Sequence, residues 1–249
     1  MSGHSKWASI KHKKKATDAK RGKLFTKLAR AIAVAAREGG GDPDGNPALA
    51  LAIDKAKQAS MPKDNIQRAI DRGTGDGADA DAIERIVYEG YGPGGAALLV
   101  EALSDNRNRT GSEIRHAFDR HGGNLGEPNS VAWMFEKRGI IAIDAEAHDE
   151  DDLIGAIDAG ADDVEAGEDE LRVICDPASF TAVREALEAD GIGIVSAEVT
   201  MEPTNTVEVE ESDAKRLLNL MEALDDHDDV DAVHANFEIP ADVLERVAA

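Results

Sequence analysis

The residues with the clearest chemistry form a basic segment at the start of the chain. Residues 1–30 contain ten Lys or Arg and one acidic residue, a net charge of +9, whereas the whole chain of 249 residues carries −22. Exposed Lys and Arg clusters bind polyanions, because each cationic group neutralises a phosphate and releases counterions. Trp7 and two histidines stand among the lysines, and their rings can stack on bases. The segment predicts a nucleic-acid-binding arm; a solvated basic tail and a targeting peptide are the alternatives.

Fourteen residues are candidates for nucleic-acid contact, and twelve of them belong to this segment. Arg107 and Arg109 complete the set because they precede an expected helix N-terminus, where free backbone N–H groups favour phosphate. Ion pairing with Asp105, Glu113 and Asp119 is the alternative role of the two arginines. The candidates are His4, Lys6, Trp7, Lys11, His12, Lys13, Lys14, Lys15, Lys20, Arg21, Lys23, Lys27, Arg107 and Arg109.

Charge changes strongly along the chain after the arm. Residues 31–72 are neutral, residues 73–138 carry −4, and residues 139–249 carry −27. Such a charge dipole orients a molecule as it approaches a polyanion, with the basic end first. We therefore expect nucleic acid to contact the N-terminal head and to avoid the acidic C-terminal half. A salty cytoplasm is a second explanation for so acidic a surface.

The head is expected to be a bundle of three helices. Apolar residues recur with helical spacing over 20–38, 47–60 and 62–72, and glycines follow the first and third segments. Asn46 is the expected N-cap of the second helix, with Pro47 at its first position. A helix-turn-helix that reads a DNA groove is one interpretation of these segments. Short antiparallel helices without that role are the commoner one.

Strands are expected after the Gly/Asp-rich boundary at 73–81. The segments 83–89 and 96–103 flank the glycines of 90–95, which match G-x-G-x-x-G formally. A dinucleotide site needs a helix directly after the glycines, and here a strand follows, so the glycines predict a hairpin turn. Thr110 and Glu113 fit a capping box that begins the next helix.

Two strands, 131–135 and 140–143, are expected to flank a turn at 137–139. A new acidic unit begins after them, with the pattern of a helix, two strands, a helix and a strand. Residues 204–249 then supply a helix and strands that complete the middle domain. The predicted fold class is α+β: a helical bundle with the basic arm at 1–78, a ferredoxin-like middle domain at 79–143 plus 204–249, and a split βαβ domain at 144–203 inserted into it.

Several stretches resemble the YebC/PmpR family of probable transcriptional regulators. They are GHSKWASIKHKKKATDAKRGKLFTKLAR, NPALALAIDKAKQASMPKDNIQRAIDRG, YEGYGPGGAALLVEALSDNRNRTGSEIRHAF and VAWMFEKRGII, and together they span nearly the whole chain. The resemblance implies the same three-domain plan. The family pattern has a glycine where this chain has Asn129, and Asn also tolerates a left-handed backbone.

No enzymatic, metal or cofactor motif is recognisable. G-x-S-x-G, P-loop and H-E-x-x-H sequences are absent, and the acidic run 225–231 lacks the Gly and Glu of a calcium loop, so a solvated turn is expected there. The single cysteine, Cys175, lies in a buried-strand pattern and excludes an internal disulfide. No apolar run reaches the ~18 residues of a membrane span, and the arm is Lys-rich rather than Arg-rich as transit peptides are. We expect a cytoplasmic protein that is not an enzyme, has no membrane partner and carries no cofactor.

Two functions remain open at this stage. The first is a DNA-binding transcriptional regulator, as the family name implies. The second is a translation factor that docks on ribosomal RNA or the ribosome, as the family's mitochondrial relatives imply; a Lys-rich arm carrying Trp and His suits irregular RNA better than a duplex. The sequence shows no cluster for bidentate base reading and leaves the oligomeric state open.

Overall fold

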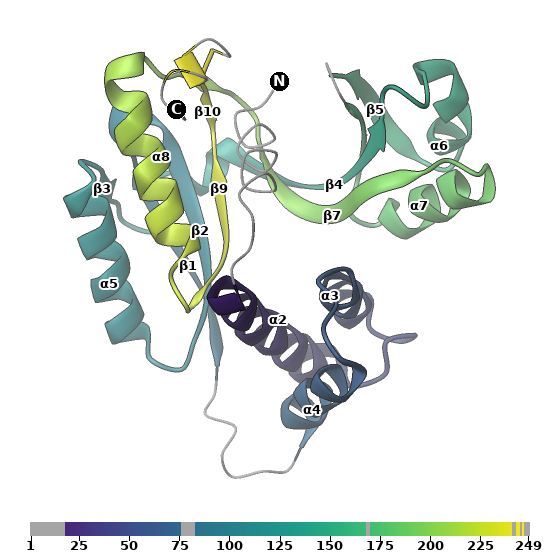
Figure 1. Cartoon of the computed structure of the whole chain (residues 1–249), viewed down its shortest axis with the longest axis horizontal. Coiled ribbons are helices and arrows are strands. Elements are labelled where there is room, and N and C mark those ends of the chain that lie inside the picture. Colours follow the sequence, from purple (N-terminus) through teal and green to yellow (C-terminus); the bar gives the residue numbers. More distant parts are fainter. Residues whose placement is uncertain (1–17, 76–82, 168–169, 241–242, 245, 247–249) are drawn as a thin grey trace. The chain divides into compact units, whose positions relative to one another are not determined.

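The computed structural model describes residues 18–75, 83–167, 170–240, 243, 244 and 246 (Figure 1). The chain forms two compact units. One unit is Met134–Thr204, and the other combines Ser2–Trp133 with Asn205–Ala249. The larger unit contains a helical head and a sheet covered by helices, whereas the smaller unit is a separate sheet with its own helices.

The head consists of three helices, as expected. They are α2 (Asp18–Gly39), α3 (Pro47–Gln58) and α4 (Lys63–Thr74). Ile32, Leu49 and Ile66 lie in its aliphatic core. The junction between α2 and α3 depends on Asn46, whose Oδ1 accepts the backbone N–H of Leu49 at 3.1 Å while its amide donates to two carbonyls at the end of α2. The predicted N-cap at Asn46 is therefore confirmed.

The middle of the larger unit is an antiparallel four-stranded sheet. Helices α5 (Arg107–Arg120) and α8 (Glu211–Asp225) cover one face of it (Figure 1). Ile114 and Phe118 of α5 and Leu217 of α8 are fully buried against this face. A short parallel pair, β8 (Val207–Glu208) with β10 (Phe237–Glu238), flanks the sheet. In spatial order the four strands are β3 (Asn124–Leu125), β1 (Glu84–Tyr91), β2 (Ala97–Ser104) and β9 (Val230–Ala235).

The glycines between β1 and β2 form a hairpin turn, as predicted. Pro93–Gly95 is one 3₁₀ turn, and Gly94 and Gly95 have φ values of 74° and 77°. Only glycine adopts this left-handed backbone without steric cost. The next element along the chain is strand β2, as the sequence predicts for a hairpin.

The start of α5 differs from the prediction. The N-cap is Asn106, whose Oδ1 accepts the N–H of Arg109 at 3.1 Å, and the helix begins at Arg107. Thr110 lies inside the helix and is fully buried, so the capping box of Thr110 and Glu113 was wrong. The sequence contains two cap-like residues four apart, and the burial of Thr110 selects the earlier one.

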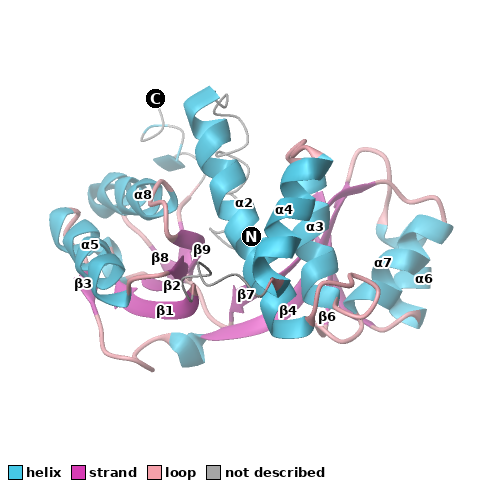
Figure 2. Cartoon of the chain, turned by 90° about the horizontal axis from the view of Figure 1, so that it is seen from below, coloured by secondary structure: helices cyan, strands magenta, loops and turns pink. Residues whose placement is uncertain are grey.

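The smaller unit has the complete β-α-β-β-α-β order of a split βαβ fold. Its spatial strand order is β5-β6-β4-β7, and α6 and α7 pack together (Figure 2). Ile141 and Ile143 of the sheet and Leu187 of α7 belong to its buried core. The elements are β4 (Phe135–Asp144), a 3₁₀ turn (Glu150–Leu153), α6 (Ile154–Asp158), β5 (Ala161–Ala166), β6 (Glu170–Cys175), α7 (Phe180–Ala189) and β7 (Ile194–Pro203).

The first strand of this unit corrects two expectations. Residues 135–144 form one strand, not two strands around a turn at 137–139, and a 3₁₀ turn (Ala132–Met134) precedes it. Strand β4 pairs with both β6 and β7, so it belongs to the inserted sheet and the unit starts at residue 134 rather than 144. Hydrogen bonding to strands far along the chain, which local sequence does not encode, places this boundary. The predicted α+β fold class, with three N-terminal helices followed by antiparallel sheets, is confirmed.

Candidate nucleic-acid interface

The structure describes side chains for five of the fourteen candidate residues. Eight candidates lie within residues 1–17, outside the described residues, and Lys20 lies in the first turn of α2 without a described side chain. The five are Arg21, Lys23 and Lys27 on α2, and Arg107 and Arg109 at the start of α5.

Helix α2 carries three basic residues along one face. Lys23, Lys27 and Arg30 are spaced four and three residues apart, which places them above one another on a helix. All three bind the acidic turn that joins α8 to β9. Lys23 Nζ lies 3.2 Å from Asp228 Oδ1, and Arg30 Nη1 donates to the Asp228 carbonyl at 2.8 Å. Lys27 Nζ donates to the carbonyl of Asp225.

Asp229 is the centre of this contact. Its side chain is only 5% exposed, and its two oxygens accept from both α2 and α5. Arg30 Nη1 donates to Oδ1 at 2.7 Å, while Thr110 Oγ1 and Arg109 Nη2 donate to Oδ2 at 2.6 and 2.8 Å. Ser104 Oγ lies 3.2 Å from Oδ2 and completes the set. One carboxylate thus joins the head, α5 and β2.

The charge of Asp229 is stabilised despite its burial. Burial raises the pKa of the carboxyl, but hydrogen bonds from Thr110 and Arg109, with Arg30 close by, outweigh it and hold the pKa at about 2. The hydrogen bonds of Arg109 to Asp229 and Asp105 raise the pKa of its guanidinium. Asp229 is therefore ionised at any physiological pH.

The acidic run at 225–231 is not the solvated turn that the sequence suggested. Its carbonyls and carboxylates bind the basic face of α2, and Asp229 is buried. Sequence reasoning missed Arg30 and Asp229 as interacting residues. Their only sequence signal is the match between a basic helix face and an acidic turn about 200 residues later. Within the described ranges, no group of three or more His, Cys, Asp or Glu is placed to hold a metal ion.

Other basic residues of the larger unit remain at the surface. Arg21 is exposed and its guanidinium stacks over the Phe25 ring at 5.5 Å. Arg109 pairs with Asp105 at 2.9 Å as well as with Asp229, so the ion-pairing alternative holds for it. Arg107 is exposed, and within the described ranges it forms no ion pair. Arg21 and Arg107 are thus the described candidates available to a phosphate.

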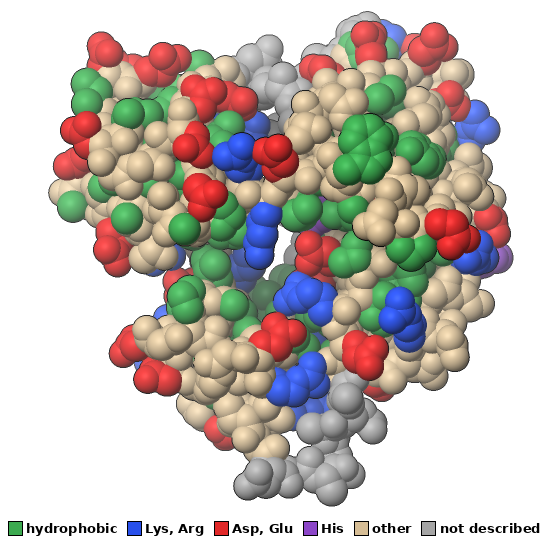
Figure 3. All heavy atoms as spheres, turned by 180° about the vertical axis from the view of Figure 1, so that it is seen from behind, with side chains coloured by type: hydrophobic (Ala, Val, Ile, Leu, Met, Phe, Trp, Pro, Cys, Tyr) green, Lys and Arg blue, Asp and Glu red, His purple; other side chains and the backbone are tan. Residues whose placement is uncertain are grey.

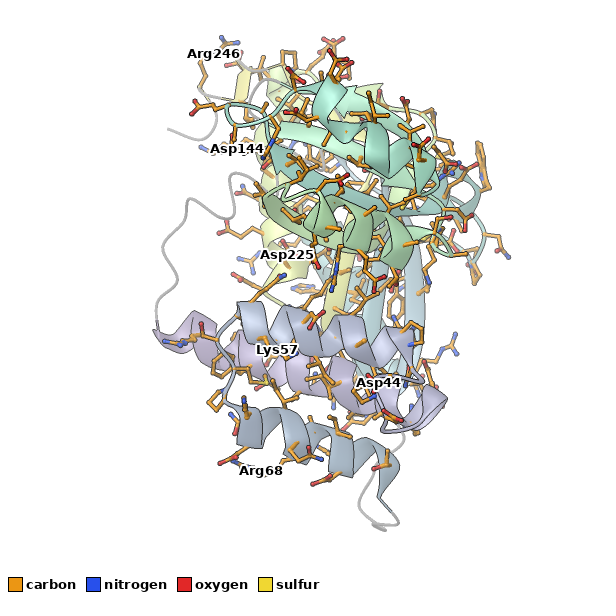
Figure 4. All side chains as sticks on the ribbon, turned by 90° about the vertical axis from the view of Figure 1, so that its right-hand side faces the viewer. Asp44, Lys57, Arg68, Asp144, Asp225 and Arg246 are labelled. Atoms are coloured by element: carbon orange, nitrogen blue, oxygen red, sulfur yellow. The ribbon has the colours of Figure 1, made fainter. Side chains whose placement is uncertain are left out.

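The outer face of α4 carries mixed charge. Arg68 lies on the outer side of the helix (Figure 4) and donates to the Asn65 side chain at 2.9 Å and to the Asp64 carbonyl at 3.1 Å. Gln67 donates to Asp71 at 2.9 Å. Gln67 and Arg68 are thus engaged with residues of the same helix. Arg72, one turn after Arg68, is exposed and forms no ion pair with the described residues, so the one bidentate donor left on this face is a single arginine.

Known proteins similar to this chain identify its family. A family model described as the TACO1/YebC protein N-terminal domain matches residues 5–76, and one for the TACO1/YebC second and third domain matches residues 83–237. The chain belongs to the TACO1/YebC family. A protein from Rubrobacter xylanophilus named "Probable transcriptional regulatory protein" is 57% identical over the full length of both chains, and one of the same name from Dictyoglomus turgidum is 53% identical, also over both full lengths.

A solved relative has the same fold. The crystal structure of the conserved hypothetical protein Aq1575 from Aquifex aeolicus matches with a TM-score of 0.82 at 47% identity, covering 93% of this chain and 96% of that one. The relatives' names make this TACO1/YebC protein a regulator by family. None of the described helices is long and apolar enough to cross a membrane.

Proposed function

We propose that this TACO1/YebC protein is a regulatory protein that binds nucleic acid through its N-terminal arm and the exposed start of α2. The supporting observation is the separation of charge, +9 over residues 1–30 against −27 over residues 139–249. A polyanion is attracted to the first segment and repelled by the second. The name "Probable transcriptional regulatory protein" shared by its relatives agrees with a nucleic-acid partner.

The acidic turn at 225–229 limits which Lys and Arg side chains are available for phosphate contacts. Lys23 and Lys27 already bind the 225–229 turn, so a phosphate that reaches them competes with an internal partner. Arg21 forms no ion pair with the described residues, so a phosphate meets no such competition there. We assign the first phosphate contacts to Lys13, Lys14 and Lys15, and a secondary role to the basic face of α2.

Two targets are compatible with this chemistry. The names of the relatives favour DNA and a role in transcription. On α4, Gln67 and Arg68 are engaged within the helix, and the exposed Arg72 suits a phosphate of either nucleic acid. A Lys-rich arm with Trp7 and His12 also suits unpaired bases. We favour an RNA target, including ribosomal RNA, with DNA as the second candidate.

The salt dependence of binding tests the arm directly. Replacing Lys13, Lys14 and Lys15 together by Ala should flatten the slope of log K against log salt by about 2 for single strands and about 2.7 for duplex DNA. The matched control replaces Lys55, Lys57 and Lys63 of the head by Ala, which removes the same charge elsewhere and should leave the slope unchanged. Equal slopes for wild type and the arm variant would refute the proposed function.

The target class is tested in a cell lysate. If the protein acts on ribosomal RNA, it should co-migrate with ribosome fractions in a way that survives DNase and is lost with RNase. If the protein instead co-purifies with DNA, in a way that survives RNase and is lost with DNase, transcriptional regulation would be favoured. Duplex DNA, duplex RNA and single-stranded RNA of equal length should then be compared at one salt concentration, because affinities at different salt are not comparable.

We further propose that the protein acts by binding, in the cytoplasm, and not as an enzyme. Burial raises the pKa of the only cysteine, Cys175, to about 11, so its thiol is not a nucleophile at neutral pH. The carboxyl of Asp229, whose pKa is strongly lowered, accepts hydrogen bonds from Arg30, Arg109 and Thr110 and so holds α2 and α5 together. Incubation with ester, phosphoester and nucleotide substrates should give no turnover above that of the heat-treated protein.

A further inference from the structure

The face of the larger sheet opposite α5 and α8 carries unexplained apolar side chains. Strand β1 alternates, so Ile86 and Tyr88 pack toward the helices while Val87, Glu89 and Tyr91 project from the other face. Val87 is 47% exposed and Tyr91 36% exposed. Seen from behind, where this face is visible, hydrophobic side chains lie beside Lys and Arg side chains (Figure 3).

Two aromatic side chains bind the same carbonyl oxygen at one end of this face. Tyr91 Oη and Trp133 Nε1 each donate to the carbonyl oxygen of Ser130, both at 3.2 Å. Trp133 is 69% exposed, more than any other large hydrophobic residue in the described part of the chain. The shared acceptor holds both rings against the same short loop.

The loop that carries Trp133 is fixed by a buried carboxylate. Glu89 accepts the backbone N–H groups of Asn129, Val131 and Ala132 at 2.6, 2.8 and 2.7 Å. Burial raises the pKa of Glu89, but these three bonds outweigh it and the pKa is lowered. Asn129 takes the left-handed conformation, with φ of 69°, that the tight turn requires. The indole is therefore pre-positioned, and little entropy is lost when a ligand contacts it.

The core does not need the exposed ring. Val131, two residues before Trp133, is fully buried and anchors the loop. An indole held at the surface by a rigid loop leaves a large apolar face open to a ligand. The N–H of Trp133 and the O–H of Tyr91 are already used, so the rings offer their π-faces rather than polar edges.

The exposed apolar area on this face indicates which kind of ligand fits it. The exposed large hydrophobics described on this face are Val87, Tyr91 and Trp133. A stable protein partner needs about 800 Å² on each side, whereas an aromatic ring buries about 150–250 Å². The area of two rings matches that of one or two planar bases. Glu89, which lies between Val87 and Tyr91 in β1, is buried, and its charge is compensated by three N–H groups.

We infer that Trp133 and Tyr91 form a stacking platform for an unpaired base of single-stranded RNA. This inference rests on the proposed function, because the arm must hold the phosphate chain for its bases to reach a second site on the same unit. Sequence-specific RNA proteins commonly splay unpaired bases onto aromatic side chains. The platform adds base contacts to an arm whose phosphate contacts carry no sequence information.

Tryptophan fluorescence tests the platform, because the chain has only two tryptophans, Trp7 and Trp133. In a Trp7→Phe background the emission comes from Trp133 alone. Titration with single-stranded oligouridine or oligoadenosine should quench this emission. Trp133→Ala should weaken binding by about 5- to 150-fold, the range for one stacked base, without changing the salt slope. Trp133→Phe should recover part of the affinity.

Controls separate this inference from the proposed function. Ile157→Ala removes an exposed apolar side chain on the other unit and should bind like wild type. Unchanged thermal melting of Trp133→Ala confirms that the variant folds. If wild type binds RNA with a salt slope set by the arm, while Trp133→Ala binds equally well and no quenching occurs, the platform is refuted and the proposed function stands. If wild type binds no nucleic acid, both fail.

The nucleic-acid form is tested with the same fluorescence signal. Duplex RNA should neither quench Trp133 nor lose affinity in Trp133→Ala, because its bases are stacked inside the helix. Single-stranded DNA should bind more weakly than RNA of the same sequence. Tighter binding of single-stranded DNA with the same dependence on Trp133 would overturn the assignment to RNA.

Discussion

Replacing Asp229 by Asn should weaken the attachment of the helical head to the middle of the larger unit. The carboxylate accepts from Arg30 on α2 and from Arg109 and Thr110 on α5. An asparagine keeps the shape but loses the charge, and its NH₂ group presents hydrogens where donors now point. Arg30 and Arg109 would then lie beside a neutral group that satisfies only part of their donors.

The pKa gives the magnitude of this effect. The folded-state pKa of Asp229 is about 2, against an ordinary value of 3.8. Each pKa unit corresponds to about 1.4 kcal/mol, so ionic interactions of this carboxylate contribute about 2 kcal/mol to folding. Its side chain is 5% exposed, so solvent screening reduces this figure little. We expect Asp229→Asn to lower the free energy of unfolding by about 2–3 kcal/mol.

Urea denaturation followed by circular dichroism measures the loss, with Asp228→Asn as the matched control. Asp228 belongs to the same turn, but its side chain is 65% exposed and pairs only with Lys23 among the described ion pairs. An exposed pair contributes about 0–1 kcal/mol, so the control should be nearly neutral. A double-mutant cycle with Arg30→Gln should give a coupling energy above about 0.5 kcal/mol. Equal stability of the two Asn variants would refute the assignment of Asp229 as the anchor.

Three further predictions concern stability and reactivity. The folded-state pKa of Asp229 is lowered, so its contribution to the free energy of unfolding is complete above about pH 5 and is lost as the pH falls from about 4 to about 2. The acid-induced loss of stability should therefore be smaller in Asp229→Asn than in wild type. Identical stability profiles against pH for the two proteins would contradict this. Glu89→Gln should lower the free energy of unfolding by about 1–3 kcal/mol because three backbone donors lose a charged acceptor. The exposed Glu127→Gln is its control in the same thermal melts, and equal melting temperatures would argue against a fixed loop. Cys175 is buried with its pKa raised to about 11, so iodoacetamide at pH 7.5 should label it only in urea, and rapid labelling of the native protein would contradict its burial.

Local sequence patterns were sufficient for most helices and for the first hairpin. Helical spacing of apolar residues predicted α2, α3 and α4, and Asn46 marked the start of α3 as its cap. The glycines of 90–95 predicted a turn because a strand follows them. These features depend on residues within a few positions of one another, and for that reason sequence alone is informative about them.

Pairing between distant residues was not predictable in the same way. Strand β4 looked like two strands around Lys137 and Arg138, because nothing local shows that it pairs with β6 and β7 on either side. Thr110 looked like a cap because its type and spacing fit one. Its burial against Asp229 depends on a residue 119 positions away.

The sequence by itself determined the charge distribution, the three helices of the head and the candidates of the basic arm. Only the tertiary structure decided that the basic face of α2 meets the acidic turn at 225–229, and that Asp229 is a buried anchor rather than a solvated residue. It also decided that Trp133 is held in solvent beside Tyr91, whereas Val131 in the same apolar stretch is buried. The physical reason is that burial and ion pairing depend on which surfaces meet after folding. Two residues of the same type and local pattern can therefore end in opposite environments.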